Sequence, residues 1–113
     1  MNCIFCKIIA GEIPAQKLYE DDATIAIRDI NSVAPHHILV MPKKHCPSIH
    51  EVDKSEVSLL GKVMETVSTI VKQEKLDKAG YRLVINAGEV AGQTVPHLHV
   101  HVLGGRAFAW PPG

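Results

Sequence analysis

The stretch that decides the fold runs from Gly92 to Gly105 and reads Gly-Gln-Thr-Val-Pro-His-Leu-His-Val-His-Val-Leu-Gly-Gly. Within it, His97, His99 and His101 alternate with aliphatic residues. Because the side chains of a β-strand alternate between its two faces, the imidazoles share one face and the aliphatics share the other. Successive histidines then lie about 6–7 Å apart, which suits groups acting on different atoms of one substrate. A solvent-exposed edge strand that merely uses histidine is the simpler alternative, but three histidines in strict alternation favour a functional site.

The composition describes a single domain with balanced charge. The chain has 113 residues, with 12 basic and 12 acidic side chains, and this length suits one hydrophobic core. A net charge of zero provides no basic stripe for long nucleic acids, and no apolar run approaches the roughly 20 residues of a membrane span. Lys7 and Glu12 come too early for a signal peptide, and three cysteines, an odd number, fit a reducing compartment. We therefore expect a cytoplasmic protein that binds neither nucleic acid nor membrane.

The hydrophobic pattern predicts five strands and two helices. Apolar residues at helical intervals indicate a short helix around residues 4–9, and a long helix over 54–75 follows a capping-box pattern from Asp53 to Glu56. The apolar stripe of the long helix indicates a core or dimer surface. The expected strands are 17–20 and 23–27, which form a hairpin, then 38–41, 81–85 and the histidine strand; 81–85 is expected to pair with the histidine strand.

Cys3 and Cys6 form a C-x-x-C pair with three open interpretations. The pair can chelate zinc, run redox chemistry, or pack as unreactive thiols. Redox motifs usually follow a strand, and here only two residues precede Cys3. Zinc needs two further ligands, for which His45 is one candidate.

Three further features are candidates for the site. Asp29 ends a predicted strand, where a carboxylate is usually a turn former but can also accept bonds from sugar hydroxyls. His37 enters an apolar strand and is either a structural histidine or a partner of the triad. The loop from Asn86 to Thr94 contains two glycines, which let backbone N–H groups approach a phosphate closely.

The pattern His-x-His-x-His, with aliphatic residues between and after the histidines, resembles the signature of the histidine triad (HIT) superfamily. The resemblance covers nearly the whole chain and is closest to the HINT branch, the purine nucleoside phosphoramidases. Gly104-Gly105-Arg106 and the terminal Trp110-Pro-Pro-Gly carry that finer resemblance; dinucleoside polyphosphate hydrolases of the superfamily typically continue from the triad with Pro-Arg. Further matching segments are 4–9, 19–22, 29–30, 34–37, 40–44 and Asn86.

The resemblance implies a fold, a reaction and a set of roles. The fold is α+β, with helix packed on an antiparallel sheet and two subunits joined into one continuous sheet, so 1–113 is expected to be one domain of a homodimer. The reaction is hydrolysis of an AMP-amine or a similar purine nucleoside phosphoramidate, including aminoacyl or lysyl derivatives, through a covalent nucleotidyl-histidine. The catalytic residues implied are His99 as nucleophile, with His101, His37 and His97. The substrate-binding residues implied are Asp29 for the ribose; Asn86, Gly92, Gln93, Thr94 and Val95 for the phosphate; Ile4, Phe5, Ile8, Ile27 and Ile30 for the base; and Trp110 on a tail, 106–113, near the active site.

The chain departs from the HINT pattern at three places. Ile27 stands where an aromatic is common, which implies a weaker hold on the base, and Thr94 replaces a serine while keeping the hydroxyl. Cys3, Cys6 and His45 resemble zinc-binding bacterial members, in which the first triad histidine, here His97, completes the site. Such a Cys₂His₂ set has no open position and is structural, so no cofactor is required for the chemistry.

Other functions compete with the phosphoramidase. A metallohydrolase could bind zinc through His-x-His with His37 as third ligand and a water in the open position. A non-catalytic nucleotide-binding or regulatory protein would bind AMP without turnover. A dinucleoside polyphosphate hydrolase of the same superfamily would differ in substrate preference. The leaving group, the choice between adenine and guanine, and the role of Cys46 do not follow from the sequence.

Overall fold

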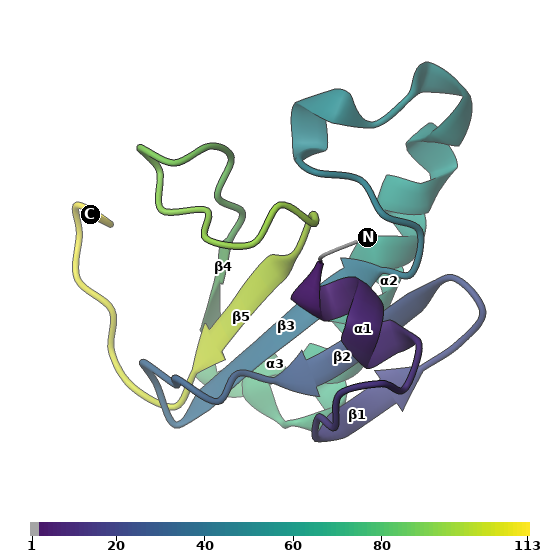
Figure 1. Ribbon diagram of the computed structural model, residues 1–113. Coiled ribbons are helices and arrows are strands. Elements are labelled where there is room, and N and C mark those ends of the chain that lie inside the picture. Colours follow the sequence, from purple (N-terminus) through teal and green to yellow (C-terminus); the bar gives the residue numbers. More distant parts are fainter. Residues whose placement is uncertain (1–2) are drawn as a thin grey trace.

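The computed structural model describes residues 3–113 and contains a five-stranded antiparallel sheet between two helices of very different length (Figure 1). The strands are β1 (Lys17–Glu20), β2 (Thr24–Arg28), β3 (His36–Pro42), β4 (Tyr81–Val84) and β5 (Val100–Gly104), in the spatial order β1-β2-β3-β5-β4. The helices are α1 (Ile4–Ile9), α2 (Val57–Gln73) and the single turn α3 (Leu76–Ala79), with two 3₁₀ turns at Ile49–Glu51 and Lys54–Glu56. The expected α+β class, the five strands and the single long helix are confirmed.

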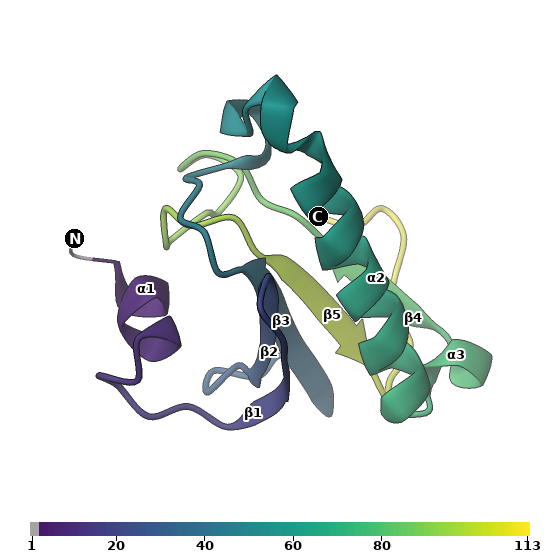
Figure 2. The same cartoon turned by 90° about the vertical axis from the view of Figure 1, so that its right-hand side faces the viewer.

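The two helices α1 and α2 lie on opposite faces of the sheet (Figure 2). The period-two pattern of the strands sorts their side chains between these faces. On β3, for example, Ile38 and Val40 join the core under α2, whereas Leu39 and Met41 join the core under α1. Val100 and Val102 of β5 face α2, so the aliphatic side of the histidine stretch is packed as expected.

The histidine strand is shorter than its sequence pattern predicts. Pairing of β5 with its neighbours begins at Val100, so only His101 of the triad lies in a regular strand. The preceding residues are extended but bond elsewhere: Leu98 N donates to Cys46 O at 2.7 Å. The alternation nevertheless persists, because the His99 ring contacts the His101 ring and Phe5 contacts both His97 and His99.

The long helix also differs from its predicted bounds. Asp53 accepts a hydrogen bond from Ser55 N at 2.9 Å, one residue earlier than a capping box requires, and the chain first makes a 3₁₀ turn. Glu56 pairs with Lys44 in place of closing the box. At the other end, Lys75 adopts a left-handed conformation with φ of 60°, which ends the helix before 75. None of the helices in the part described is long and apolar enough to cross a membrane.

Candidate active site

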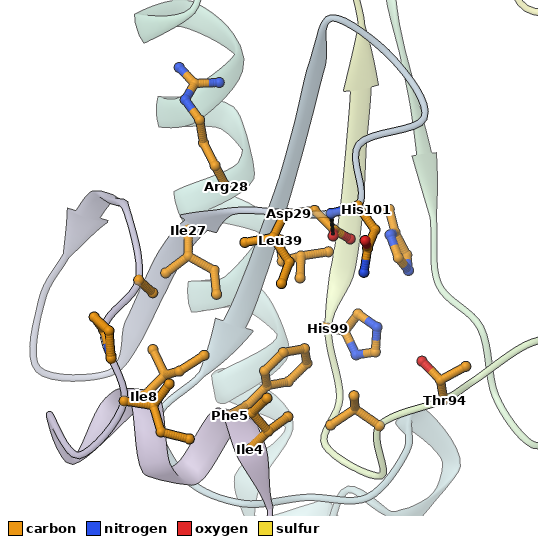
Figure 3. A pocket seen from close by; sticks show the side chains of 16 residues that line it. Ile4, Phe5, Ile8, Ile27, Arg28, Asp29, Leu39, Thr94, His99 and His101 are labelled. Carbon is orange, nitrogen blue, oxygen red and sulfur yellow. Dashed lines mark hydrogen bonds between the residues drawn. The ribbon is translucent and has the colours of Figure 1, made fainter.

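A pocket of about 350 Å³ lies on the α1 side of the sheet, between α1 and the histidine strand (Figure 3). Ile4, Phe5 and Ile8 of α1 form an apolar wall. His99, His101 and Thr94 lie at the opposite, polar side, with Asp29 at the rim. A cavity with one apolar wall and a few convergent polar groups is the usual form of a small-molecule site.

The pocket gathers most of the residues that the sequence singled out. Ten line it: Ile4, Phe5, Ile8, Ile27, Asp29, Ile30, Thr94, Val95, His99 and His101. Six others do not line it: His37, Asn86, Gly92, Gln93, His97 and Trp110. Trp110 is 82% exposed, and its tail runs beside β4, where Arg82 Nη2 donates to Ala109 O at 2.9 Å.

The loop expected to bind phosphate is well ordered by its own hydrogen bonds. Gln93 N donates to Gly88 O, and Gly88 N donates to the Gln93 side chain at 2.9 Å. The Gln93 amide also donates to Pro47 O and Val95 O. Gly92 has φ of +95°, and a Cβ added there would lie 3.9 Å from Asn86 Nδ2. The Gln93 side chain therefore stabilises the conformation of the loop through its hydrogen bonds. Gly92 lies beside Asn86.

Sequence reasoning missed six lining residues: Ile13, Pro14, Ala15, Arg28, Asn31 and Leu39. Arg28 and Asn31 flank Asp29 in the sequence, and Leu39 is the register partner of Ile27. The side chain of Arg28 points away from the pocket in Figure 3 and binds Glu74 at 2.7 Å. A strict period-two analysis of residues 36–42 could have assigned Leu39 to the same face as the pocket.

Backbone groups determine which nitrogen of His99 carries the proton. His99 Nδ1 lies 2.7 Å from His97 O, and a carbonyl oxygen can only accept. Nδ1 is therefore the protonated nitrogen, and Nε2 of the neutral ring carries a lone pair. An imidazole held in this tautomer is suited to act as a nucleophile.

The same reasoning gives His101 the opposite tautomer. Val33 N donates to His37 Nδ1 at 3.1 Å, so a neutral His37 carries its proton on Nε2. That Nε2 lies 2.9 Å from His101 Nδ1 and 3.3 Å from Asp29 Oδ2. His37 donates, His101 Nδ1 accepts, and His101 keeps its proton on Nε2. The site thus contains one imidazole with a free lone pair and one with a free N–H.

Burial favours the neutral form of His37 and His101. It lowers the pKa of His37, against the opposing effect of the Asp29 carboxylate. Burial, with the nearby His99 and His37, lowers the pKa of His101 to about 4. His101 is therefore uncharged near neutral pH.

His97 lies outside the pocket and belongs to a second cluster. It is fully buried, and its Nε2 donates to Pro42 O at 2.8 Å. Its Nδ1 lies 3.5 Å from Cys3 Sγ, 3.6 Å from Cys6 Sγ and 3.3 Å from His45 Nδ1. Cys6 Sγ lies 3.3 Å from His45 Nδ1.

These distances fit a tetrahedral zinc ion. Bond lengths of about 2.3 Å to sulfur and 2.0–2.1 Å to nitrogen, at tetrahedral angles, place neighbouring ligand atoms about 3.3 Å (N to N) and about 3.6 Å (S to N) apart. The Nε2–H of His97 also leaves Nδ1 as the ligand nitrogen, directed at the cluster. The four ligand atoms lie within 4.8 Å of one another.

The group Asp29, His37 and His101 is equally compact but does not fit a metal. The Val33 N–H at His37 Nδ1 leaves a proton on His37 Nε2, the nitrogen that faces the group. A protonated nitrogen has no lone pair for a metal ion. The proton on His37 Nε2 instead forms the hydrogen bond to His101 Nδ1.

Comparison with known proteins identifies the family of this chain. Residues 10–108 match the HIT domain family, and the chain belongs to that family. It is 53% identical over 112 residues to an uncharacterized HIT-like protein of Synechococcus elongatus, covering 99% of this chain and 97% of that one. Among solved structures, it superposes on a HIT family hydrolase from Legionella pneumophila with a TM-score of 0.96 and 46% identity, covering 99% of this chain and all of the other. It also resembles a histidine triad nucleotide-binding protein from Candida albicans, with a TM-score of 0.83 and 34% identity, covering 96% of this chain and 85% of the other.

Proposed function

We propose that this protein hydrolyses purine nucleoside 5′-monophosphoramidates through a covalent nucleotidyl-histidine on His99. One observation carries the proposal. His99 donates Nδ1–H to His97 O at 2.7 Å, which leaves an Nε2 lone pair in the pocket. The similarity to a HIT family hydrolase and to a histidine triad nucleotide-binding protein supports the reaction type and the ligand class.

Some residues of the pocket bind the substrate and others take part in the reaction. The apolar wall from α1 takes the base, and Asp29 accepts bonds from the ribose hydroxyls. His99 Nε2 attacks phosphorus, and the P–N bond to the amine breaks. The Nε2–H of His101 and the Thr94 hydroxyl donate hydrogen bonds to charge that develops on the phosphoryl oxygens. Because neutral imidazole is a very weak acid, we assign His101 to hydrogen-bond donation and expect the departing amine to take its proton from water. A second water then attacks phosphorus and gives its proton to the hydroxide left by the first. The bond from phosphorus to His99 Nε2 breaks, its electron pair returns to Nε2, and nucleoside monophosphate is released.

A zinc ion bound by Cys3, Cys6, His45 and His97 is the structural part of this proposal. With four protein ligands it has no open position and takes no part in the reaction. When bound, it joins α1, which carries the base wall, to His97, whose carbonyl orients His99.

A homodimer joined along β4 completes the proposal. β4 is at the edge of the sheet, and its Tyr81 and Leu83 are 44% and 38% exposed. Val57 and Met64 of α2 are also exposed, at 54% and 42%. An exposed apolar edge strand is a natural place for strand pairing between subunits. The tail with Trp110 contacts this edge through Arg82 and would lie at such an interface.

The test is intact mass spectrometry of protein quenched during turnover of an AMP phosphoramidate. Wild type, His99→Ala and a control, His50→Ala, are run in parallel; His50 is exposed and lies outside the pocket. We expect an acid-labile gain of one AMP per subunit in wild type and control, and none in His99→Ala. Turnover without an adduct would favour a metal-activated water. AMP binding with neither adduct nor turnover would favour a binding protein, and faster cleavage of diadenosine polyphosphates would favour the other hydrolase class.

A further inference from the structure

The loop between β2 and β3 supplies the backbone N–H that sets the tautomer of His37, yet packing holds this loop only beyond Val33, where Ala34 is buried. Ile30 is 94% exposed and Val33 is 59% exposed. The start of the loop is fixed by Asp29, whose carboxylate accepts from Asn31 N and whose carbonyl accepts from the Ser32 hydroxyl, each at 2.8 Å. The far end, at Val33, needs another anchor.

Arg106 is that anchor. Its Nε donates to Val33 O at 3.1 Å, on the residue whose N–H binds His37. The backbone conformation at Gly105 brings the segment before Arg106 close to Pro35, at the end of the loop. Gly105 has φ of +92°, and a Cβ added there would lie 2.8 Å from Pro35 Cβ, so only glycine lets the chain turn against the loop exit.

The guanidinium of Arg106 is itself held in place. It lies 4.3 Å from the centre of the Phe108 ring, and its Nη1 donates to Ala107 O at 2.9 Å. Arg82 contacts the same ring at 5.2 Å. Stacking on an aromatic ring reduces the freedom of an exposed arginine, which otherwise makes a poor anchor.

We propose that Arg106 is a positioning residue that fixes the protonated nitrogen of His101 through Val33 and His37. Arg106 holds the Val33 carbonyl, the Val33 amide donates to His37 Nδ1, and His37 Nε2–H donates to His101 Nδ1. When this anchor is lost, the Val33 amide moves away from His37. Only the Asp29 carboxylate, 3.3 Å from His37 Nε2, then favours a proton on that nitrogen. Part of the protein therefore shifts to the other tautomer at both rings, and His101 loses its fixed Nε2–H donor. The catalytic importance of Arg106 rests on the proposed function, whereas its effect on the tautomers of His37 and His101 can be measured in the substrate-free protein.

The test is nitrogen-15 NMR of histidine tautomers in the substrate-free protein, with wild type, Arg106→Ala and Lys72→Ala. We expect wild type to show Nε2–H at His37 and His101 and Nδ1–H at His99. Arg106→Ala should show mixed tautomers at His37 and His101 while His99 is unchanged, because His99 is fixed by His97 O. Lys72→Ala is the control: it removes an exposed cation from α2, outside the tail and the pocket, and should match wild type.

Kinetics supply the second readout. For Arg106→Ala we expect kcat to fall about three- to tenfold, as for the loss of one hydrogen bond, and KM to change less than about twofold, because Arg106 does not line the pocket. Unchanged tautomers in Arg106→Ala, or equal mixing in Lys72→Ala, would overturn the inference. Mixed tautomers in a protein without phosphoramidase activity would instead refute the proposed function and leave the role of Arg106 standing.

Discussion

At the scale of single residues, the backbone selects the chemical form of each histidine near the pocket. Carbonyl oxygens of Pro42 and His97 accept from His97 and His99, and the amide of Val33 donates to His37. These partners leave one imidazole lone pair toward the Cys/His cluster and one in the pocket. The three histidines between positions 97 and 101 therefore differ in which nitrogen carries the proton and in what their free nitrogen faces.

The buried state of His101 predicts an acid-sensitive fold. Its pKa is about 4 in the folded protein, against an ordinary value of 6.5. The unfolded chain therefore binds more protons between these values, and the contribution of His101 to stability is complete above about pH 6.5 and is lost as pH falls toward 4. The full shift corresponds to about 3 kcal/mol, and solvent screening of this partly exposed ring makes the loss smaller. Urea unfolding at several pH values checks this, and His101→Gln should show a shallower pH dependence; equal slopes in both proteins would contradict it.

At the scale of elements, the short helix α1 contributes to both the pocket and the Cys/His cluster. It has only six residues, too few to be stable alone. Phe5 and Ile8 pack against the sheet, while Cys3 at the N-cap and Cys6 in the first turn face His45 and His97. A metal ion at this cluster would supply the fixed attachment that the helix lacks.

Removing one ligand should therefore release zinc and loosen α1. We expect Cys6→Ser to lose the single equivalent of zinc per chain and to unfold at a lower temperature, because a structural zinc ion stabilises the folded state directly. Cys46→Ser is the control, since Cys46 is a free thiol outside the cluster that bonds Ser48 O. Metal analysis and thermal melts measure both effects. Equal zinc content in the two variants would show that the cluster is not a zinc site.

At the scale of the whole molecule, the exposed edge of β4 is the interface of the proposed homodimer. Leu83→Lys places a charge on this edge and should convert a dimer to a monomer. Light scattering after size exclusion measures the mass. Ile4→Lys is the matched control, because Ile4 is similarly exposed, at 46%, but lies on α1 across the sheet from α2 (Figure 2). A dimer that persists in Leu83→Lys, or dissociates equally in Ile4→Lys, would exclude β4 as the interface.

The sequence by itself determined the strands and the face on which each triad histidine lies, because these follow from side-chain periodicity. The fold class came from the resemblance to the HIT superfamily. The sequence also placed Asp29 and Thr94 at the same pocket as His99, by resemblance. Its errors lie at element ends: the histidine strand begins at Val100 because the residues before it bond Cys46, and the long helix begins at Val57 because Asp53 tightens the first turn.

Only the tertiary structure decided which nitrogen of each ring carries the proton and which residues hold it there. The partners are peptide groups of Pro42, His97 and Val33, and every residue has such groups, so no side-chain pattern reveals them. The link from Arg106 to Val33 spans 73 positions and depends on the turn at Gly105. Periodicity is a local property of the chain, whereas the tautomer of a buried histidine is set by whichever backbone group folding brings to it.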